Sequence, residues 1–172
     1  MFNYCPKCTS KEIIFDGEKK FHCIECNWIF YQSVAAAVLC ILTFEGKILL
    51  LTRAQDPKKG FLDLPGGFVN CNENAEKALE RELYEELGIH ISDFTYLGSA
   101  PNTYLYANVT YHVCDMIYFA PLKHIPTNFD YSEVEKIQLM DINEINESEL
   151  AFPSGIEALK IFNGKILNKI IN

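Results

Sequence analysis

Three glutamates close together on one predicted helix have the chemistry of a metal site. Glu82, Glu85 and Glu86 stand at positions i, i+3 and i+4 of the segment 74–87, whose apolar residues recur at helical spacing. At about 100° per residue, Glu82 and Glu86 fall inside the apolar face of this helix and Glu85 falls at its edge. Carboxylates turned toward an apolar interior are tolerated when a cation pairs with them. Hard oxygen ligands suit Mg2+ or Mn2+, so the pattern predicts a site for such an ion.

The alternative is an acidic stripe exposed to water, which many surface helices carry. Such a stripe would lie opposite the leucines of the helix. That opposite face instead holds Lys77, Arg81 and Tyr84. The placement of the glutamates therefore favours the metal site.

Four cysteines near the N-terminus form a second set of metal ligands. They occur as two C-x2-C pairs separated by 14 residues, namely Cys5 and Cys8, then Cys23 and Cys26. Thiolates bind Zn2+ in a tetrahedron, and each C-x2-C turn supplies two of them. Because four cysteines leave no open position, the predicted Zn2+ is structural. Four unrelated buried cysteines and a redox C-x-x-C motif are the alternatives. The segment resembles the zinc-ribbon family.

The same short segment offers little to nucleic acid. Its positive and negative side chains balance in number, so it lacks the positive surface that follows a phosphate backbone, and we expect no nucleic-acid partner. Its aromatic residues are expected to pack the ribbon on the rest of the chain or on a second subunit. A ligand platform is the alternative for these rings, which are Phe21, Trp28, Phe30 and Tyr31.

The remaining pattern predicts the elements that position these residues. Residues 1–31 form the small zinc module, whose hairpin turns at Asp16-Gly17 and brings the cysteine pairs together. Residues 32–172 form the main domain. Its predicted elements are strands over 34–44 and 47–53, breaks at 54–60 and 64–67, a helix over 74–87 capped by Asn72 or Glu73 and ended by Gly88, strands over 93–99, 103–106, 109–120 and 135–140, and a closing helix over 154–162.

Composition and charge limit the partners further. The 172 residues are 49% hydrophobic and 22% charged, as in an ordinary globular protein, which excludes a disordered chain or a coiled coil. No apolar run approaches the ~20 residues that a bilayer requires, and no secretory signal is visible. We therefore expect a cytoplasmic protein with no membrane partner. The net charge of −8 would repel a polyanion unless cations were bound.

The stretch that contains the three glutamates resembles the Nudix box, G-x5-E-x7-R-E-U-x-E-E-x-G-U, where U is a bulky aliphatic residue. Every fixed position of the box is matched, by Gly67, Glu73, Arg81, Glu82, Leu83, Glu85, Glu86, Gly88 and Ile89. The resemblance implies an α/β fold, the α/β/α sandwich with a mixed sheet, here preceded by the zinc-ribbon β-hairpin module. It also implies a Mg2+-dependent pyrophosphohydrolase that cleaves the diphosphate bridge of a nucleoside diphosphate derivative, and a chain that can form a homodimer.

The resemblance assigns roles within the box. The three glutamates of the helix bind the Mg2+ or Mn2+ ion, with the backbone carbonyl of Gly66 or Gly67 as a further ligand. Glu73 and Arg81 form a pair that ties the preceding loop to the helix. One carboxylate takes a proton from the attacking water. Glu82 is the first choice for this general base, and an acid of the later segment 130–135, Glu133 or Glu135, is the alternative.

The substrate is less closely defined than the reaction. Nudix proteins with a zinc ribbon include NADH pyrophosphatases, whose Ser-Gln-Pro-Trp-Pro-Phe-Pro stretch is reduced here to the Ser-x-Pro framework within 99–106. A small molecule of the ADP-ribose, dinucleotide or nucleotide-sugar type is therefore expected, with an NAD(H) pyrophosphatase or a non-hydrolytic ligand sensor as alternatives. Candidate substrate contacts are Phe61, Phe68, Tyr104, Tyr106 and Glu133; for the aromatic residues the alternative is packing on the sheet, and for Glu133 simple solvation.

Overall fold

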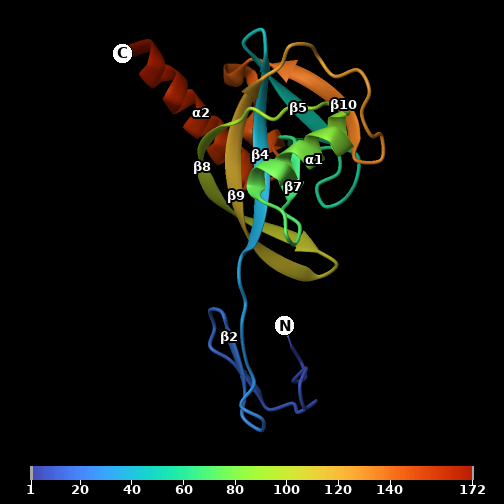
Figure 1. Cartoon of the computed structure of the whole chain (residues 1–172), viewed down its shortest axis with the longest axis vertical. Helices are drawn as coiled ribbons and strands as arrows, with labels where there is room; N and C mark the ends of the chain where they lie inside the picture. The colour runs from blue at the N-terminus through green and yellow to red at the C-terminus, as the bar shows by residue number, and fades with distance from the viewer. Residues whose placement is uncertain (1, 172) are drawn as a thin grey trace.

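A computed structural model describes residues 2–171 of the chain, with side chains up to residue 165. Figure 1 shows a small N-terminal sheet at one end of the molecule and a larger domain at the other, joined by an extended segment. The short strands of the N-terminal part are β1 (Ile13–Phe15), β2 (Lys20–Cys23) and β3 (Ile29–Tyr31). The larger domain contains β4 (Ala35–Phe44), β5 (Lys47–Arg53), β6 (Leu62–Asp63), β7 (Gly66–Phe68), α1 (Ala75–Leu87), β8 (Thr95–Tyr106), β9 (Val109–Pro121), β10 (Val134–Met140), two 3-10 turns, η1 (Ile142–Glu144) and η2 (Glu147–Glu149), and α2 (Pro153–Ile171).

The N-terminal module is an antiparallel sheet of order β1-β2-β3. Its first turn forms as predicted, because the Asp16 carboxylate accepts hydrogen bonds from the backbone amides of the three residues 18–20. The third strand, β3, was not predicted. The aromatic rings of this module pack on one another, with Phe2 edge-to-face against Phe21, Trp28 and Phe30 at 5.1–5.6 Å.

The larger domain is built on a mixed sheet of order β10-β5-β4-β9-β8. The long strands β4 and β9 run parallel, and the remaining neighbours are antiparallel. Two short strands extend the sheet, with β6 paired to β5 and the glycine-containing β7 paired to β4. The predicted hairpin of β4 and β5 is confirmed, with its turn at Glu45 and Gly46.

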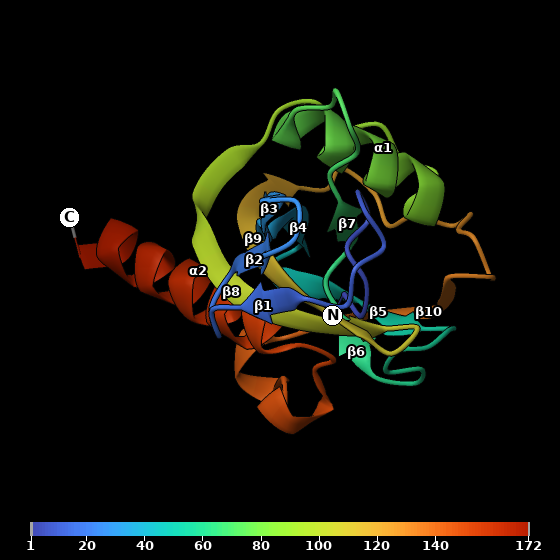
Figure 2. The same ribbon diagram turned by 90° about the horizontal axis from the view of Figure 1, so that it is seen from below.

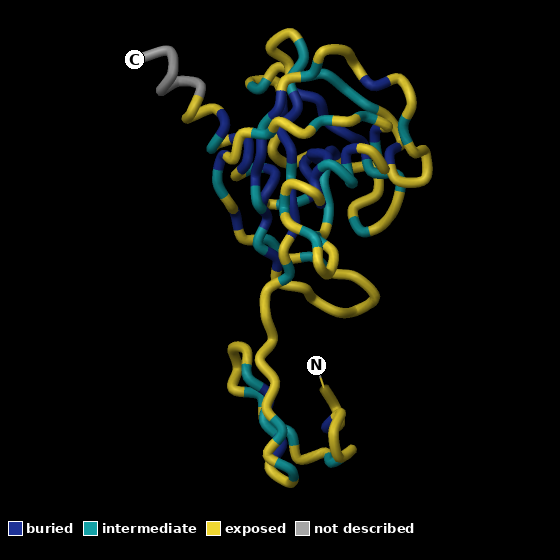
Figure 3. The backbone as a smooth tube through the Cα atoms, viewed as in Figure 1, coloured by how far each residue is buried: buried dark blue, intermediate teal, exposed yellow. Residues whose placement is uncertain are grey.

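One helix covers each face of this sheet, and Figure 2 shows α1 and α2 on opposite sides of it. Leucines and small residues of α1 pack on one face, and the apolar side of α2 packs on the other. The buried positions, dark blue in Figure 3, run along the sheet between the two helices. No helix in the described chain is long and apolar enough to cross a membrane.

The predicted fold class is therefore confirmed, and the element boundaries need four corrections. The two strands expected over 93–99 and 103–106 form one strand, β8, which runs from Thr95 to Tyr106 with a bulge near Gly98. The expected break at 64–67 overlaps the short strand β7. The closing helix α2 is longer than predicted and runs from Pro153 to Ile171. The N-cap of α1 is Asn74, not Asn72 or Glu73, because its side chain accepts a hydrogen bond from the amide of Lys77.

Candidate active site

Helix α1 fixes the direction of the predicted metal ligands. Its buried side chains are Ala78, Leu79, Leu83 and Leu87, and each fully buried leucine contributes about 1.5–3 kcal/mol to folding. Gly88 ends the helix in the left-handed conformation, with φ of 64°. Because the leucines cannot leave the core, the positions beside them on the helix surface have a fixed orientation toward the sheet.

Glu82 and Glu86 extend from this helix toward Gly66 and Gly67, the first two residues of β7. The backbone amide of Gly66 donates a hydrogen bond to Glu86 Oε2 at 3.0 Å. Burial raises the pKa of Glu86 well above its ordinary value, and nearby carboxylates, Glu82 first among them, raise it further. Burial also raises the pKa of Glu82, whose side chain is 13% exposed. Two partly desolvated carboxylates on one surface form a site that a cation would stabilise.

The guanidinium of Arg81 organises the residues around these carboxylates. It donates two hydrogen bonds to Glu73, at 3.0 and 2.9 Å, and one to the carbonyl of Phe68 at 2.9 Å. It also reaches Glu82 at 2.7 Å and Glu85 at 2.9 Å. The hydrogen bonds from Arg81 lower the pKa of Glu73. The arrangement ties the loop to the helix, which is the role that the resemblance implied for the pair Glu73 and Arg81.

Glu85 occupies a different environment from the other two helix glutamates. Its carboxylate faces Arg81, and its side chain is 53% exposed. It does not line the cavity into which Glu82 and Glu86 point. Its predicted role as a metal ligand therefore requires it to turn away from Arg81.

The two glycines of β7 allow the backbone to approach the carboxylates closely. Gly66 has φ of 145°, a conformation that other residues rarely adopt. A Cβ atom at Gly67 would lie 2.5 Å from the carboxyl carbon of Glu82. A side chain at Gly67 would thus occupy the space in front of this carboxylate.

A cavity of about 320 Å³ opens beside these residues. Its lining includes Glu82, Glu86, the two glycines of β7 and Glu133 of the loop before β10, and the carboxylates of Glu82 and Glu133 lie close enough to raise the pKa of Glu86. Glu135, the other late acid considered as a base, lies in a separate hollow beside β5. The carboxylate oxygens of Glu82 and Glu86, whose pKa values are raised, are of the kind that a divalent cation such as Mg2+ prefers.

The predicted substrate contacts divide between several places. Phe68, Tyr104 and Glu133 line the cavity. Tyr106 lies outside it, in a neighbouring aromatic hollow formed with Phe68, Tyr104 and Tyr111. Phe61 lies in the hollow beside β5, with the ammonium group of Lys58 over its ring at 5.0 Å.

Residues that the sequence pattern did not predict also line the cavity. They are Arg53, Asp63, Asn102, Asp115, Phe152 and Ser154. Burial raises the pKa of Asp63 to about 6, against the opposing effect of Arg53, which forms an ion pair with Asp63 at 2.9 Å. Burial likewise raises the pKa of Asp115. Acidic residues inside apolar strands were the signal available in the sequence.

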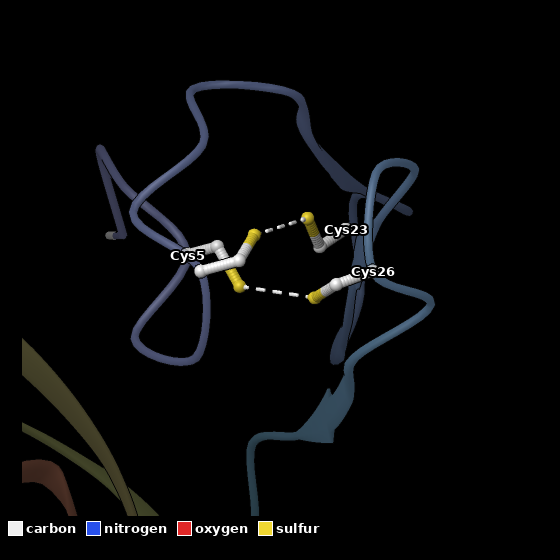
Figure 4. Close-up of side chains that lie close together, drawn as sticks. Cys5, Cys23 and Cys26 are labelled. Carbon is white, nitrogen blue, oxygen red and sulfur yellow. Dashed lines mark hydrogen bonds between the residues drawn. The ribbon is translucent and has the colours of Figure 1, made fainter.

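The four predicted cysteine ligands come together in the N-terminal module. Their sulfur atoms lie within 4.8 Å of one another, a group that could hold a metal ion. Figure 4 shows Cys5 facing Cys26, with 3.6 Å between their sulfurs, and the sulfurs of Cys8 and Cys23 are also 3.6 Å apart. Sulfurs at ~2.3 Å from a tetrahedral ion lie about 3.8 Å apart, so the cluster fits such an ion.

Comparison with known proteins assigns the chain to a family. The family model for the NUDIX domain matches residues 32–159, and the chain belongs to the Nudix family. The crystal structure of a NUDIX hydrolase from Nitrosomonas europaea superimposes with a TM-score of 0.66 and 26% identity, over 92% of this chain and 89% of that one. The α/β/α sandwich of this chain is thus the fold of a known NUDIX hydrolase structure.

Two curated relatives carry functional names. The NAD-capped RNA hydrolase NudC of Vibrio parahaemolyticus is 26% identical over 144 residues, which cover 83% of this chain and 52% of the relative. The ADP-ribose pyrophosphatase of Methanocaldococcus jannaschii is 48% identical over 87 residues, which cover 51% of this chain and 48% of the relative. The chain thus spans about half the length of these two relatives.

Proposed function

We propose that the chain is a metal-dependent pyrophosphohydrolase that cleaves the diphosphate bridge of a nucleoside diphosphate derivative. The observation that carries this proposal is the convergence of Glu82, Glu86 and the glycines of β7 on one cavity that is large enough for part of a nucleotide. Membership of the Nudix family supports it. The names of the two curated relatives make ADP-ribose the first substrate to test, followed by NAD-type dinucleotides.

The metal in this proposal is Mg2+ or Mn2+, held by the carboxylates of Glu82 and Glu86, with Glu85 and the carbonyl of Gly67 as further ligands. When bound, the ion neutralises phosphate charge and lowers the pKa of a coordinated water. Arg81 contributes by holding the helix carboxylates and the loop in one orientation. Water attacks one phosphorus, the bridging P–O bond breaks, and the departing phosphate takes the bonding electron pair.

The proton lost by the attacking water passes to a carboxylate of the chain. Glu82 is the proposed general base, because its carboxylate lines the cavity and is partly desolvated. Glu133 is the alternative base, since it lines the same cavity. Glu135 is the weaker of the two late acids, because it lines a different hollow.

The N-terminal cysteines are proposed to hold a structural Zn2+ ion, because four sulfur ligands leave no position for a substrate. A homodimer, the cytoplasmic location and the lack of a nucleic-acid partner stay predictions. The Vibrio relative is named for an RNA substrate, so NAD-capped RNA belongs in any substrate panel.

The test is a substrate panel with the intact chain, measured with Mg2+ and again with EDTA. The panel contains ADP-ribose, NADH, FAD, nucleotide sugars, deoxynucleoside triphosphates and NAD-capped RNA. ADP-ribose should yield AMP and ribose 5-phosphate with Mg2+ alone, and Glu86→Gln should abolish this turnover. Tight binding of a nucleotide without cleavage of any substrate would contradict the proposal and indicate a ligand sensor.

A further inference from the structure

The part of the cavity lined by β8, β9 and α2 contains a cluster of polar side chains. Asp115 of β9, Asn102 of β8 and Ser154 of α2 line this part together, although they lie far apart in the sequence. Asp115 and Ser154 are 2% and 1% exposed. Polar groups buried to this extent normally have hydrogen-bond partners. A donor or acceptor position that no protein group occupies therefore points to a ligand.

Asp115 has capacity left to accept hydrogen bonds. Its Oδ2 atom accepts one from Nδ2 of Asn102 at 2.9 Å. The orientation of that amide is fixed, because its own oxygen accepts a hydrogen bond from the backbone of Thr103 at 2.8 Å. An ionised carboxylate offers about four acceptor positions, so Asp115 can accept a further hydrogen bond from a ligand.

Ser154 supplies a donor beside this acceptor. Its hydroxyl lies close enough to Asp115 to lower the pKa of that carboxyl group, against the larger raising effect of burial. Its Oγ atom nevertheless has no hydrogen-bond partner of normal geometry among the side chains and backbone described. A buried hydroxyl without a partner is unfavourable, and a ligand that accepts a hydrogen bond would satisfy it.

A continuous aromatic wall adjoins these groups. Phe68 and Tyr104 pack edge-to-face at 5.4 Å, and Tyr104 packs on Phe152 at 5.5 Å. The guanidinium of Arg53 lies over the outer ring, 5.2 Å from the centroid of Phe152. All three rings line the cavity. A flat ring therefore has a surface to stack on while its edge meets the polar groups.

We propose that this part of the cavity binds a nucleobase whose edge presents an amine beside a ring nitrogen, as in adenine or cytosine. The amine donates to Asp115, and the ring nitrogen accepts from the hydroxyl of Ser154. The assignment rests on the proposed function, because it places the base of the nucleoside diphosphate in this part while the diphosphate lies near Glu82 and Glu86.

Hypoxanthine is the matched probe, because its donor and acceptor stand in the reverse order to those of adenine. Its O6 atom is an acceptor that would face the carboxylate of Asp115, and its N1–H is a donor that would face the hydroxyl of Ser154. Uracil likewise presents a donor flanked by two acceptors. Loss of a hydrogen bond to a charged group weakens binding by about 10- to 100-fold, so inosine nucleotides should bind less tightly than adenosine nucleotides by this factor.

The experiment is calorimetric titration of the intact chain with AMP, IMP and ribose 5-phosphate in the presence of Mg2+. AMP should bind about 10- to 100-fold more tightly than IMP. Asp115→Asn, which keeps the shape of the side chain and removes its charge, should abolish most of this preference. Asp93→Asn is the matched control, because Asp93 is an exposed residue outside this cavity, and it should keep the preference of the wild type.

These outcomes are separate from those of the substrate panel, because equilibrium binding requires no turnover. Equal affinity for AMP and IMP would overturn the proposal, as would an unchanged preference in Asp115→Asn. So would tighter binding of ribose 5-phosphate than of AMP, which would indicate a sugar site, or no binding of either nucleotide. A clear preference for AMP in a chain that hydrolyses nothing would support this subsite and refute the proposed hydrolase.

Discussion

Replacing Glu86 by glutamine should stabilise the protein when no metal is bound. Glutamine keeps the shape of the side chain and can still accept the hydrogen bond from Gly66. It removes a carboxylate whose pKa is raised by burial and by neighbouring acids. A carboxyl group with a raised pKa in the folded state destabilises the fold as the pH rises above its unfolded value of 4.5. At pH 7 in EDTA, Glu86→Gln should therefore melt at a higher temperature than the wild type.

With a divalent metal bound, the wild type should instead melt at a higher temperature than Glu86→Gln. An ion present at 100 times its Kd stabilises the folded state by about 2.7 kcal/mol. For a chain of this size, 1 kcal/mol moves the melting temperature by about 2–4 °C. Mg2+ should therefore raise the wild-type melting temperature by about 5–10 °C. Glu86→Gln loses one of the proposed ligands and should show little of this rise.

The assay is thermal unfolding at pH 7, in EDTA and across a Mg2+ titration. Glu144→Gln is the matched control, because Glu144 is exposed and lies outside the cavity. It should follow the wild type in both conditions. Glu86 is not a metal ligand if Glu86→Gln keeps the full Mg2+ response, and its carboxylate does not destabilise the metal-free fold if the variant melts below the wild type in EDTA.

Four further substitutions test the proposed active site, the cysteine cluster and the buried Asp63. Arg81→Lys removes the guanidinium group that hydrogen-bonds Glu73 and Glu85, and it should lower kcat while circular dichroism shows an intact fold. An unchanged kcat would contradict the positioning role of Arg81. Gly67→Ala places a methyl group against the carboxylate of Glu82 and should abolish turnover of ADP-ribose, so a fully active variant would exclude this geometry. Cys5→Ser should lose zinc by elemental analysis and lower thermal stability while kcat stays close to wild type, and retention of one zinc per chain would contradict the four-sulfur site. The pKa of Asp63 is raised from 3.8 to about 6, so its carboxyl group becomes charged in the folded state only at higher pH. Relative to Asp63→Asn, the wild type should therefore lose about 3 kcal/mol of unfolding free energy as the pH rises from about 4 to about 6. Urea-unfolding measurements would contradict this if the free energies of the two proteins changed in parallel with pH.

The elements around the proposed metal site could be predicted because their local signals agree. The leucines of α1 repeat at helical spacing, and Gly88 ends the helix. The hairpin of β4 and β5 carries an apolar pattern that matches its burial on both faces. Local pattern and long-range packing favour the same structure in these segments.

Other features depend on contacts that no local pattern records. The short strands β3 and β7 exist because β2 and β4 offer them backbone partners. The long strand β8 follows β9 through a bulge at Gly98, although its residues alone suggested two separate strands. Asp115 and Ser154 meet only when β9 and α2 pack together, so their pairing was not visible in the chain order.

The exposed side of α1 shows a further limit of reasoning from helical angles. The angles placed Glu85 at the edge of the apolar face, close to the other two glutamates. In the structure, Arg81 one turn earlier draws its carboxylate outward. The direction of the Glu85 side chain follows from its ion pair with Arg81, which helical angles alone do not predict.

A crystal structure of the chain with Mn2+ and a non-hydrolysable ADP-ribose analogue, with anomalous data that locate the metal, would test the proposed metal site most directly. We expect an Mn2+ peak coordinated by carboxylate oxygens of Glu82 and Glu86 and by an oxygen of the bound diphosphate. A diphosphate bound elsewhere, with both carboxylates free of metal, would contradict the proposed site.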